Sequence, residues 1–130
     1  MKISQPIPDV EVRATDGQAF KLSELRGKNL VLYFYPKDNT PGCTTEGQDF
    51  RDCYEEFQAL DTEIFGVSRD TLKSHEGFKD KHCLPFDLIS DEHGELCALF
   101  DVIREKSLYG KKYLGIERRT FVIDRQGILR

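Results

Sequence analysis

One cysteine of this sequence stands where a thiol can react. The segment 35–46, which reads YPKDNTPGCTTE, links an apolar run to a stripe of apolar residues at helical spacing. Thr40 is a good N-cap residue, Pro41 suits the first helical position, and Cys43 then stands at the third. Free N–H groups and the positive end of the helix dipole favour a thiolate there, and the thiolate is the nucleophilic form. The segment therefore predicts a reactive cysteine, the alternative being a small apolar residue in a helical turn.

The elements on both sides of this segment predict an α/β fold. Residues 29–35 are apolar on both faces, as in a central strand whose sheet is covered on both sides. Apolar residues recur every three or four positions through 50–60, which indicates an amphipathic helix that packs on the sheet. Further strands are expected at 10–14, 18–22, 63–68, 86–89, 119–124 and 128–130. Further helices are expected at 23–27, at 70–82 with Asp70 or Ser68 as the cap, and at 90–103 with Ser90 as the cap.

Strands that alternate with helices predict an α/β sandwich, and two hairpins predict that its sheet is mixed. The first hairpin joins 10–14 to 18–22 through the turn TDG, and the last turns at 124–127. The stretch 105–117 is rich in lysine, tyrosine and glycine and is expected to be a polar loop. Because 130 residues have room for one core, the chain is expected to form a single domain over 1–130.

Composition and charge exclude several classes of protein. The formal charge of -4 and the isoelectric point near 5.4 leave no basic surface of the kind that nucleic-acid binding requires. No apolar run approaches the ~20 residues of a membrane span, and no signal sequence opens the chain. We therefore expect a cytoplasmic protein without nucleic-acid or membrane partners. In that reducing compartment most of the four cysteines are expected to stay thiols, so that a framework of structural disulfides is not expected and any cysteine with a function should be a reactive one.

The reactive segment resembles the active-site motif of the peroxiredoxins. Pro36, Thr40 and Cys43 match the Pro-x3-Thr-x2-Cys pattern of that family. Residues 34–46, which read FYPKDNTPGCTTE, are similar to the bacterioferritin comigratory protein, or PrxQ, branch. The resemblance covers essentially the whole chain, since it continues through 66–70, 86–91, 110–116 and 118–124. It implies a thioredoxin-like fold, in which helices flank a mixed central sheet.

The resemblance also implies an activity and the residues that perform it. The activity is that of a thiol-dependent peroxidase, with hydrogen peroxide as substrate and organic hydroperoxides as a second class. Cys43 would be the peroxidatic cysteine, whose sulfur attacks a peroxide oxygen and becomes a sulfenic acid. Thr40 would hold its hydroxyl toward the peroxide, Pro36 would shield the site from water, and Arg118 would stabilise negative charge. Glu46 matches an acid that braces the start of the helix.

The partners that the resemblance implies are a peroxide as substrate and thioredoxin or another thiol as reductant. No cofactor and no metal are implied, and the protein is expected to be a monomer or a weak homodimer. From the residues alone, a surface ion pair between Arg118 and Glu117 is the simpler interpretation, and the match to the motif is what favours the active-site role.

The resolving thiol departs from the pattern of the branch. Similar proteins carry it five residues after the peroxidatic cysteine, where Gln48 stands, or in the next helix, where Lys79 stands. Cys83 lies one turn beyond Lys79 on the same helical face, so we expect it to form a disulfide with oxidised Cys43. Cys53 is the weaker rival because about 15 Å of helix separates it from Cys43. If neither reacts, the enzyme is a one-cysteine type that a small thiol or partner protein reduces directly.

Other interpretations concern the remaining cysteines and histidines. Cys53 and Cys97 lie on or beside apolar stripes and are expected to be buried packing residues. His93 and Cys97 are candidate zinc ligands four residues apart on one helix, and His82 and Cys83 add two more, although no Cys-x2-Cys pair supports them. A non-catalytic binding or chaperone-like protein on the same scaffold is the other alternative. Similar proteins continue past the last hairpin into a further strand and a C-terminal helix, so we expect either that this ending is absent or that the sequence is a fragment.

Overall fold

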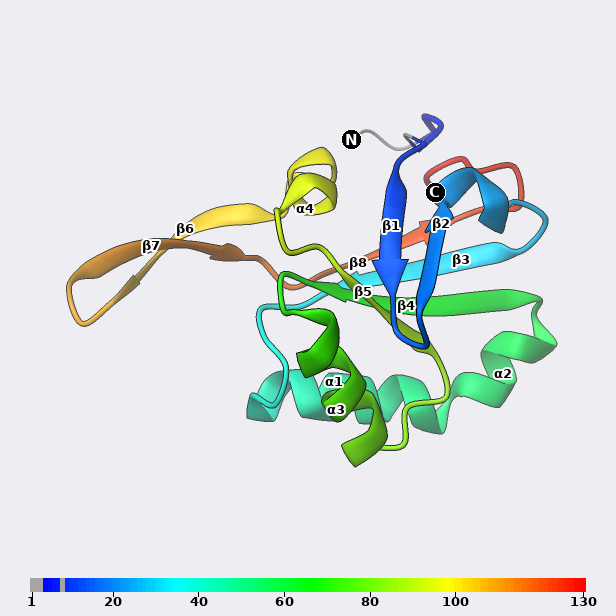
Figure 1. The fold of residues 1–130 in the computed structure, drawn as a ribbon. Coiled ribbons are helices and arrows are strands. Elements are labelled where there is room, and N and C mark those ends of the chain that lie inside the picture. The colour runs from blue at the N-terminus through cyan, green and yellow to red at the C-terminus, as the bar shows by residue number, and fades with distance from the viewer. Residues whose placement is uncertain (1–3, 8) are drawn as a thin grey trace.

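A six-stranded mixed sheet forms the centre of the protein (Figure 1). The structure is a computed structural model, and it describes residues 4–7 and 9–130. In spatial order the strands of this sheet are β2 (Gln18–Lys21), β1 (Glu11–Ala14), β5 (Asp87–Ser90), β4 (Thr62–Ser68), β3 (Asn29–Phe34) and β8 (Arg119–Ile123). A second sheet contains β6 (Ile103–Leu108) and β7 (Lys111–Ile116). The helices are a 3-10 helix, η1 (Leu22–Leu25), and α1 (Pro41–Asp52), α2 (Tyr54–Ala59), α3 (Leu72–Lys81) and α4 (Glu95–Leu99). Within the described residues, none of them combines the length and the apolar surface that a membrane span requires.

The directions of the strands confirm the prediction of a mixed sheet. β3 and β4 run parallel, with Asn29 opposite Thr62, and β4 and β5 are parallel as well. β8 runs antiparallel to β3, and β1 runs antiparallel to β5. β1 also forms the N-terminal hairpin with β2. The predicted return of the last residues is also confirmed, since Leu129 lies opposite Ile123 in an antiparallel bridge.

Side chains alternate along β3 between two buried layers. Because successive side chains of a strand point to opposite faces, every second residue belongs to the same layer. Leu32 and Phe34 lie in the layer that α4 covers, whereas Tyr33 belongs to the layer covered by α1, α2 and α3 (Figure 1). Tyr35, the residue after the strand, continues this second layer, which also contains Cys43.

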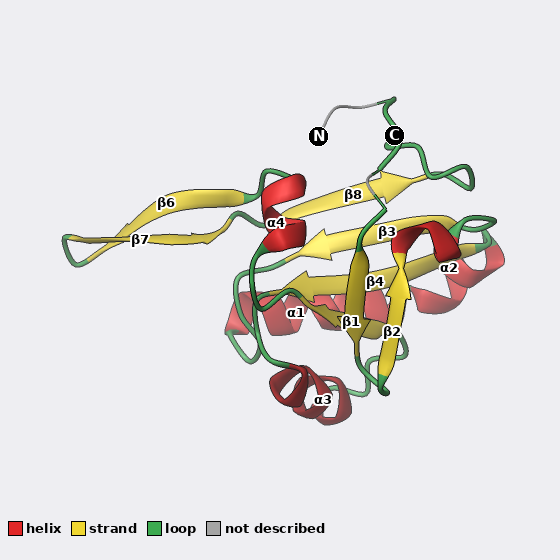
Figure 2. Cartoon of the chain, turned by 45° about the horizontal axis from the view of Figure 1, so that its top comes forward, coloured by secondary structure: helices red, strands yellow, loops and turns green. Residues whose placement is uncertain are grey.

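The stretch predicted as a polar loop at 105–117 is instead part of an antiparallel hairpin. β6 pairs with β7 from Ile103 opposite Ile116 to the turn, and the hairpin extends away from the body of the protein (Figure 2). Most of its residues are charged or exposed, so they do not show the alternation of apolar and polar residues that predicts a half-buried strand. The sequence prediction was wrong here because most of these side chains stay outside the core.

Two of the predicted helices differ from the structure at their ends. The amphipathic segment is two helices, because the backbone at Cys53 leaves the helical conformation between α1 and α2. The cap of α3 is Thr71, whose hydroxyl accepts the N–H of Ser74. Neither Ser68 nor Asp70 is the N-cap residue, so that prediction is wrong. The short helix predicted at 23–27 is the 3-10 helix η1.

The helix predicted over 90–103 is the short α4. In the first turn of α4, the N–H groups of Leu96 and Cys97 donate to the carboxylate of Asp91. The predicted cap, Ser90, plays no such part, because its hydroxyl donates to a backbone carbonyl elsewhere. Asp101 adopts a left-handed conformation with φ of 55° and ends the helical segment, after which β6 begins.

Candidate active site

The loop between β3 and α1 carries the residues that the sequence marks as reactive. The chain turns at Asn39, which adopts a left-handed conformation with φ of 64°, and Thr40 then has the extended backbone of an N-cap residue. α1 begins at Pro41, which confirms that Cys43 is the third residue of a helix. The side chain of Cys43 is buried, with 1% exposure. The thiol therefore lies at the positive end of a helix of 12 residues.

The hydroxyl of Thr40 does not cap the helix, although the residue occupies the N-cap position. It donates to the backbone carbonyl of Lys37 at 2.9 Å, and no N–H of the first turn donates to it. Thr40 is thus the N-cap residue, as predicted, but its hydroxyl turns back toward the loop. Having given its hydrogen to Lys37, the oxygen of Thr40 can only accept a further hydrogen bond. The first N–H groups of α1, next to Cys43, have no acceptor within the helix. The side chain of Thr40 does not bond to them either.

Arg118 lies against the sulfur of Cys43. Its Nη2 donates to Sγ at 3.2 Å, and its Nη1 donates to Oε1 of Glu46 at 2.7 Å. The arginine comes from the connection between β7 and β8, so the fold brings together groups 75 residues apart. The simpler pair of Arg118 with Glu117 is not formed, since Oε2 of Glu117 lies 3.3 Å from Nε of Arg104 and 3.8 Å from Nε of Arg119.

The electrostatics of this contact favour a charged guanidinium. Partial burial acts to lower the pKa of Arg118, but hydrogen bonds to Cys43 and Glu46 outweigh it and raise the pKa above its ordinary value. Burial raises the pKa of Glu46, and the bond to Arg118 opposes that rise. A Cβ at Gly42 would lie 3.2 Å from Nη2 of Arg118. The glycine therefore leaves room for the guanidinium against the first turn of α1.

Pro36 and Cys83, the other predicted site residues, form no hydrogen bond with the sulfur of Cys43 among the described residues. Pro36 is exposed at the start of the loop, directly after the buried Tyr35. Cys83 is exposed just beyond α3. The four cysteines are free thiols in this structure, so it shows the reduced protein without a bond between Cys43 and Cys83.

Cys83 has a backbone conformation that is rare for its residue type. Its φ is 52°, its N–H donates to the carbonyl of Asp80, and the N–H of Leu84 donates to the carbonyl of Lys79. These two bonds define a Schellman motif, in which glycine usually occupies the position of Cys83. A left-handed conformation costs other residues about 1–2 kcal/mol. Because α3 ends before Cys83, the prediction that this thiol continues the helical face of Lys79 is wrong.

The end of α3 rests on α1. A Cβ at Gly47 would lie 3.6 Å from Cδ2 of Leu84, and Nη1 of Arg51 donates to the carbonyl of His82 at 3.0 Å. Gly47 and Arg51 follow the reactive cysteine of α1 by one and two helical turns. The residues on both sides of Cys83 therefore contact the helix that carries the reactive thiol.

The two remaining cysteines have opposite environments. Cys53 is exposed at the end of α1, so the prediction of a buried packing residue is wrong, and the break between α1 and α2 explains why. Cys97 is fully buried, as predicted. Burial, together with a hydrogen bond from the Cys97 thiol to Asp91, raises the pKa of Cys97 far above its ordinary value. A thiol that stays protonated is a poor nucleophile, so Cys97 is a structural residue.

Lys79, the residue at one family position for the resolving thiol, is held in ion pairs. Its Nζ lies 2.8 Å from Oδ2 of Asp16 and 2.7 Å from Oδ1 of Asp87. Asp16 lies in the turn of the first hairpin and Asp87 begins β5. The lysine thus links α3 to two other elements of the fold.

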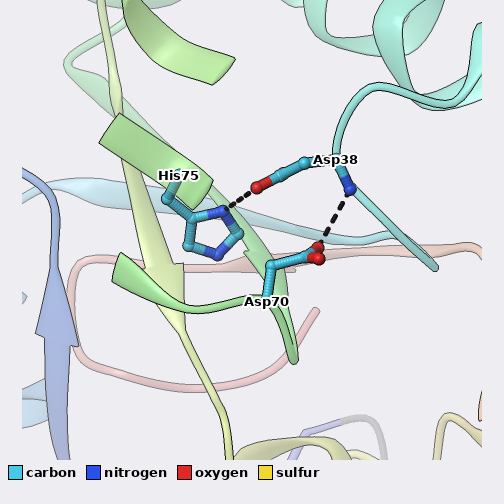
Figure 3. A group of neighbouring side chains, drawn as sticks. All are labelled: Asp38, Asp70 and His75. Carbon is cyan, nitrogen blue, oxygen red and sulfur yellow. Dashed lines mark hydrogen bonds and ion pairs between the residues drawn. The ribbon is translucent and has the colours of Figure 1, made fainter. Parts of the chain in front are cut away.

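Sequence reasoning missed a buried polar cluster behind the reactive loop (Figure 3). Nδ1 of His75 lies 2.7 Å from Oδ2 of Asp38, and the N–H of Asp38 donates to Oδ2 of Asp70 at 2.9 Å. Among the described residues, Asp38, Asp70 and His75 are the group whose side-chain atoms lie close enough together, within 4.8 Å, to hold a metal ion. Those atoms already form hydrogen bonds with protein groups. The zinc ligands considered from the sequence, such as His93 and Cys97, do not belong to it. Asp38 stands inside the motif, which is the one sequence signal that pointed here.

A cysteine at the start of a helix, with an arginine against its sulfur and a helix-flanked mixed sheet behind it, is the arrangement that the sequence led us to expect of a thiol peroxidase. Comparison with family models agrees, because residues 3–130 match the AhpC/TSA family. The chain belongs to this family and is a peroxiredoxin, a thiol-dependent peroxidase. This finding confirms the enzyme prediction over the non-catalytic alternative.

Individual relatives support the PrxQ branch. The chain is 52% identical over 129 residues to peroxiredoxin Bcp of Bacillus subtilis, which covers 99% of this chain and 82% of the relative. It is 49% identical over 119 residues to peroxiredoxin Bcp of Xanthomonas campestris, covering 92% and 74%. A solved structure of a PrxQ mutant from Xylella fastidiosa superposes with a TM-score of 0.94 at 39% identity, covering 99% of this chain and 82% of that one. The thioredoxin-like fold predicted from the resemblance is thereby confirmed.

Proposed function

We propose that Cys43 is the peroxidatic cysteine of this peroxidase. Its thiolate attacks the terminal oxygen of a hydroperoxide, and the sulfur–oxygen bond forms as the oxygen–oxygen bond breaks. Cys43 becomes a sulfenic acid, and the leaving oxygen takes up a proton and departs as an alcohol or as water. The observation that carries this proposal is the hydrogen bond of 3.2 Å from Nη2 of Arg118 to the sulfur. A fixed positive donor there favours the thiolate that the reaction needs.

Arg118, Thr40 and Pro36 complete the proposed site. As negative charge moves from the sulfur to the leaving oxygen, the guanidinium offers several donors in one plane and can stabilise both atoms. The oxygen of Thr40 is free to accept a hydrogen bond from the peroxide, because its own hydrogen is given to Lys37. Pro36 carries no N–H group and stands at the entrance of the loop, where it limits the access of water.

The sulfenic acid is resolved by Cys83 in this proposal. The thiolate of Cys83 attacks the sulfur of Cys43, the disulfide bond forms as the sulfur–oxygen bond breaks, and the leaving hydroxide takes up a proton and departs as water. Two Cα atoms must come within about 7 Å for this bond, so the first turn of α1 has to unwind. Two observations support the pairing: the neighbours of Cys83 already contact α1, and Cys83 has a left-handed backbone that is unfavourable for a residue other than glycine. Thioredoxin or another thiol then reduces the disulfide.

The substrate range, partners and location follow from the same proposal. Hydrogen peroxide and organic hydroperoxides are the substrates, and no cofactor is needed. A solved structure that concerns the alkyl peroxide reduction of the bacterioferritin comigratory protein from Xanthomonas campestris supports the second class. It is 44% identical, with a TM-score of 0.91, and the match covers 98% of this chain and 84% of that one. We assign the protein to the cytoplasm, as a single domain over residues 1–130 that acts as a monomer or a weak homodimer.

The intact mass of the protein after one equivalent of peroxide tests both cysteine roles. The wild type is expected to lose two hydrogens, as a disulfide requires, and to regain them with a thiol reductant. Cys83→Ser should instead gain one oxygen, because the sulfenic acid of Cys43 then persists. Cys43→Ser should keep its mass and consume no peroxide. The matched control is Cys53→Ser, which should behave like the wild type.

Two results would contradict these assignments separately. Peroxide consumption by Cys43→Ser at more than a trace level would remove Cys43 from the mechanism. A wild-type protein that keeps the mass of a sulfenic acid, with no peptide that joins Cys43 to Cys83, would show a one-cysteine enzyme instead.

A further inference from the structure

The carboxylate of Asp38 is the anchor of the reactive loop. Its side chain is 1% exposed, and Oδ1 accepts the hydroxyl of Tyr35 at 2.7 Å. Oδ2 bonds to Nδ1 of His75 at 2.7 Å and accepts the hydroxyl of Ser74 at 2.8 Å. The backbone N–H of the same residue donates to Asp70. The reactive loop is therefore tied at one residue to β3, to α3 and to the turn that precedes α3 (Figure 3).

One proton lies between His75 and Asp38. Nε2 of His75 faces the carbonyl of Ile89 at 3.0 Å, and a carbonyl only accepts, so Nε2 carries a hydrogen. Nδ1 faces the carboxylate oxygen at 2.7 Å. Either an imidazolium donates to a carboxylate, or a neutral ring accepts from a carboxylic acid. In both descriptions the bond contains a proton and the pair carries no net charge, which is what a fully buried pair requires.

We propose that His75 is a positioning residue of the peroxide-reducing site, because its bond to Asp38 holds the reactive loop in place. The proposal rests on the roles assigned above to Cys43 and Thr40. Between Pro36 and Thr40 the side chain of Asp38 is the buried one, and its neighbours in the loop are exposed or half-buried. The loop has no other side chain in the core, so a change at Asp38 moves the residues that follow it.

Three segments of the chain supply the titratable groups that face the ring of His75. The titratable groups that face His75 are Asp38 from the loop, Tyr35 from the end of β3 and Asp70 from the turn before α3. Burial, and then the charge of Asp38, raise the pKa of Tyr35 well above its ordinary value, so its hydroxyl keeps its hydrogen. The other contacts of the ring are the carbonyl of Ile89 and the hydroxyl of Ser68 at 3.5 Å. The ring of His75 is thus held by a hydrogen bond at each of its two nitrogens.

A displacement of Asp38 reaches the chemistry over a short stretch of chain. Asn39 and Thr40 separate it from the first residue of α1, and Asn39 already holds a left-handed turn. A shift of about 1 Å at a reacting group can slow a reaction by about 10²-fold. The His75→Leu variant, which keeps the bulk of the ring and removes both bonds, should therefore oxidise Cys43 about 10²-fold more slowly.

The experiment compares two variants at this position with a matched control. The rate constant for formation of the Cys43 sulfenic acid is measured by rapid mixing with hydrogen peroxide and chemical trapping. The amide of His75→Asn can still form a hydrogen bond with Asp38 in place of Nδ1, so this variant should lose only about 10-fold. His93→Gln changes an exposed histidine outside the cluster and should react like the wild type.

A spectroscopic measurement on the wild type makes the test independent of folding defects. In protein labelled with nitrogen-15 in histidine, the proton on Nε2 of His75 and the proton between Nδ1 and Asp38 should both exchange slowly with water, whereas the ring protons of the exposed His93 should exchange rapidly. In Asp38→Asn the proton between the ring and residue 38 should be lost or should exchange rapidly with water. Ring protons of His75 that exchange as rapidly as those of His93 would overturn the proposal.

The kinetic results also decide. Wild-type rate constants in folded His75→Leu and His75→Asn would overturn the proposal. Equal losses of rate in the two variants would also overturn it, because the hydrogen bond to Asp38 would then make no difference. If His75→Leu does not fold, Ser74→Ala serves in its place, with an expected loss of about 3- to 10-fold, since one bond of about 1 kcal/mol to the same oxygen is removed. A wild-type rate in Ser74→Ala together with His75→Asn would overturn the proposal. These outcomes leave the role of Cys43 intact, which Cys43→Ser tests separately.

Discussion

Replacing Arg118 by alanine removes the positive charge beside the reactive sulfur. Nη2 lies 3.2 Å from Sγ of Cys43. Two unit charges at that distance interact by about 5 kcal/mol at an effective dielectric constant of about 20 and by about 1 kcal/mol in bulk water. Because the side chain of Arg118 is 39% exposed, the true value lies between these limits. A loss of about 3 kcal/mol corresponds to a rate constant about 10²-fold lower.

The assay is the second-order rate constant for oxidation of Cys43 by hydrogen peroxide, measured by rapid mixing in a single turnover. Arg119→Ala is the matched control, because Arg119 is the next residue, is exposed, and pairs with Glu117 rather than with the site. Arg118→Lys keeps the charge but cannot bond Cys43 and Glu46 at once as the guanidinium does, so its rate should fall between those of wild type and alanine. An unchanged rate constant in Arg118→Ala would refute the electrostatic argument.

Further predictions concern the loop, the first turn of α1 and the ion pairs of α3. Thr40→Val should slow the peroxide step by about 10-fold, for loss of one bond of about 1.4 kcal/mol, while Thr40→Ser largely spares it; equal rates would exclude the hydroxyl. Gly42→Ala places a methyl group 3.2 Å from the guanidinium of Arg118 and should slow the same step by less than about 10-fold without lowering Tm. An unchanged rate would show that the side chain of Arg118 can move aside without cost. Lys79→Met should lower the free energy of unfolding by about 1–3 kcal/mol at neutral pH. Burial acts to raise the pKa of Asp87, but hydrogen bonds, led by the one from Lys79, outweigh it and lower the pKa below 3.8. The stabilisation by this ion pair is therefore present above pH 3.8 and is lost as the pH falls through the lowered pKa of Asp87. Urea unfolding at about pH 7 and about pH 3 should therefore show the deficit shrinking in acid.

The parts of the site that follow from local sequence could be predicted, and the parts that depend on distant contacts could not. Thr40 and Pro41 mark the start of a helix within a few residues, so the place of Cys43 was predictable from short-range rules. Arg118 is 75 residues from Cys43, and only the resemblance to a family joined the two. His75 lies in a polar helix without a periodic signal, and its burial comes entirely from the sheet and the loop packed around it.

Helix ends explain the errors at the other cysteines. Cys53 follows the apolar stripe in sequence, but the helix breaks at that residue and turns its side chain to solvent. Cys83 was expected on the face of Lys79, yet α3 stops two residues earlier and a left-handed turn sets it apart. Periodicity predicts which face a helical residue occupies, but it does not predict where the helix stops.

The base of the projecting β6–β7 hairpin is fixed to the core, which separates its exposed tip from the reactive thiol. Ile116 is buried there, and the N–H of Glu117, the residue before Arg118, donates to the carbonyl of Val102. At the far end, Tyr109 is 97% exposed in a tight turn. A protease that cuts after Tyr109 would therefore leave two fragments held together by the sheet and the core, with the guanidinium still over the sulfur. The same turn is the place to insert a tag or a fluorophore when peroxidase activity has to be preserved.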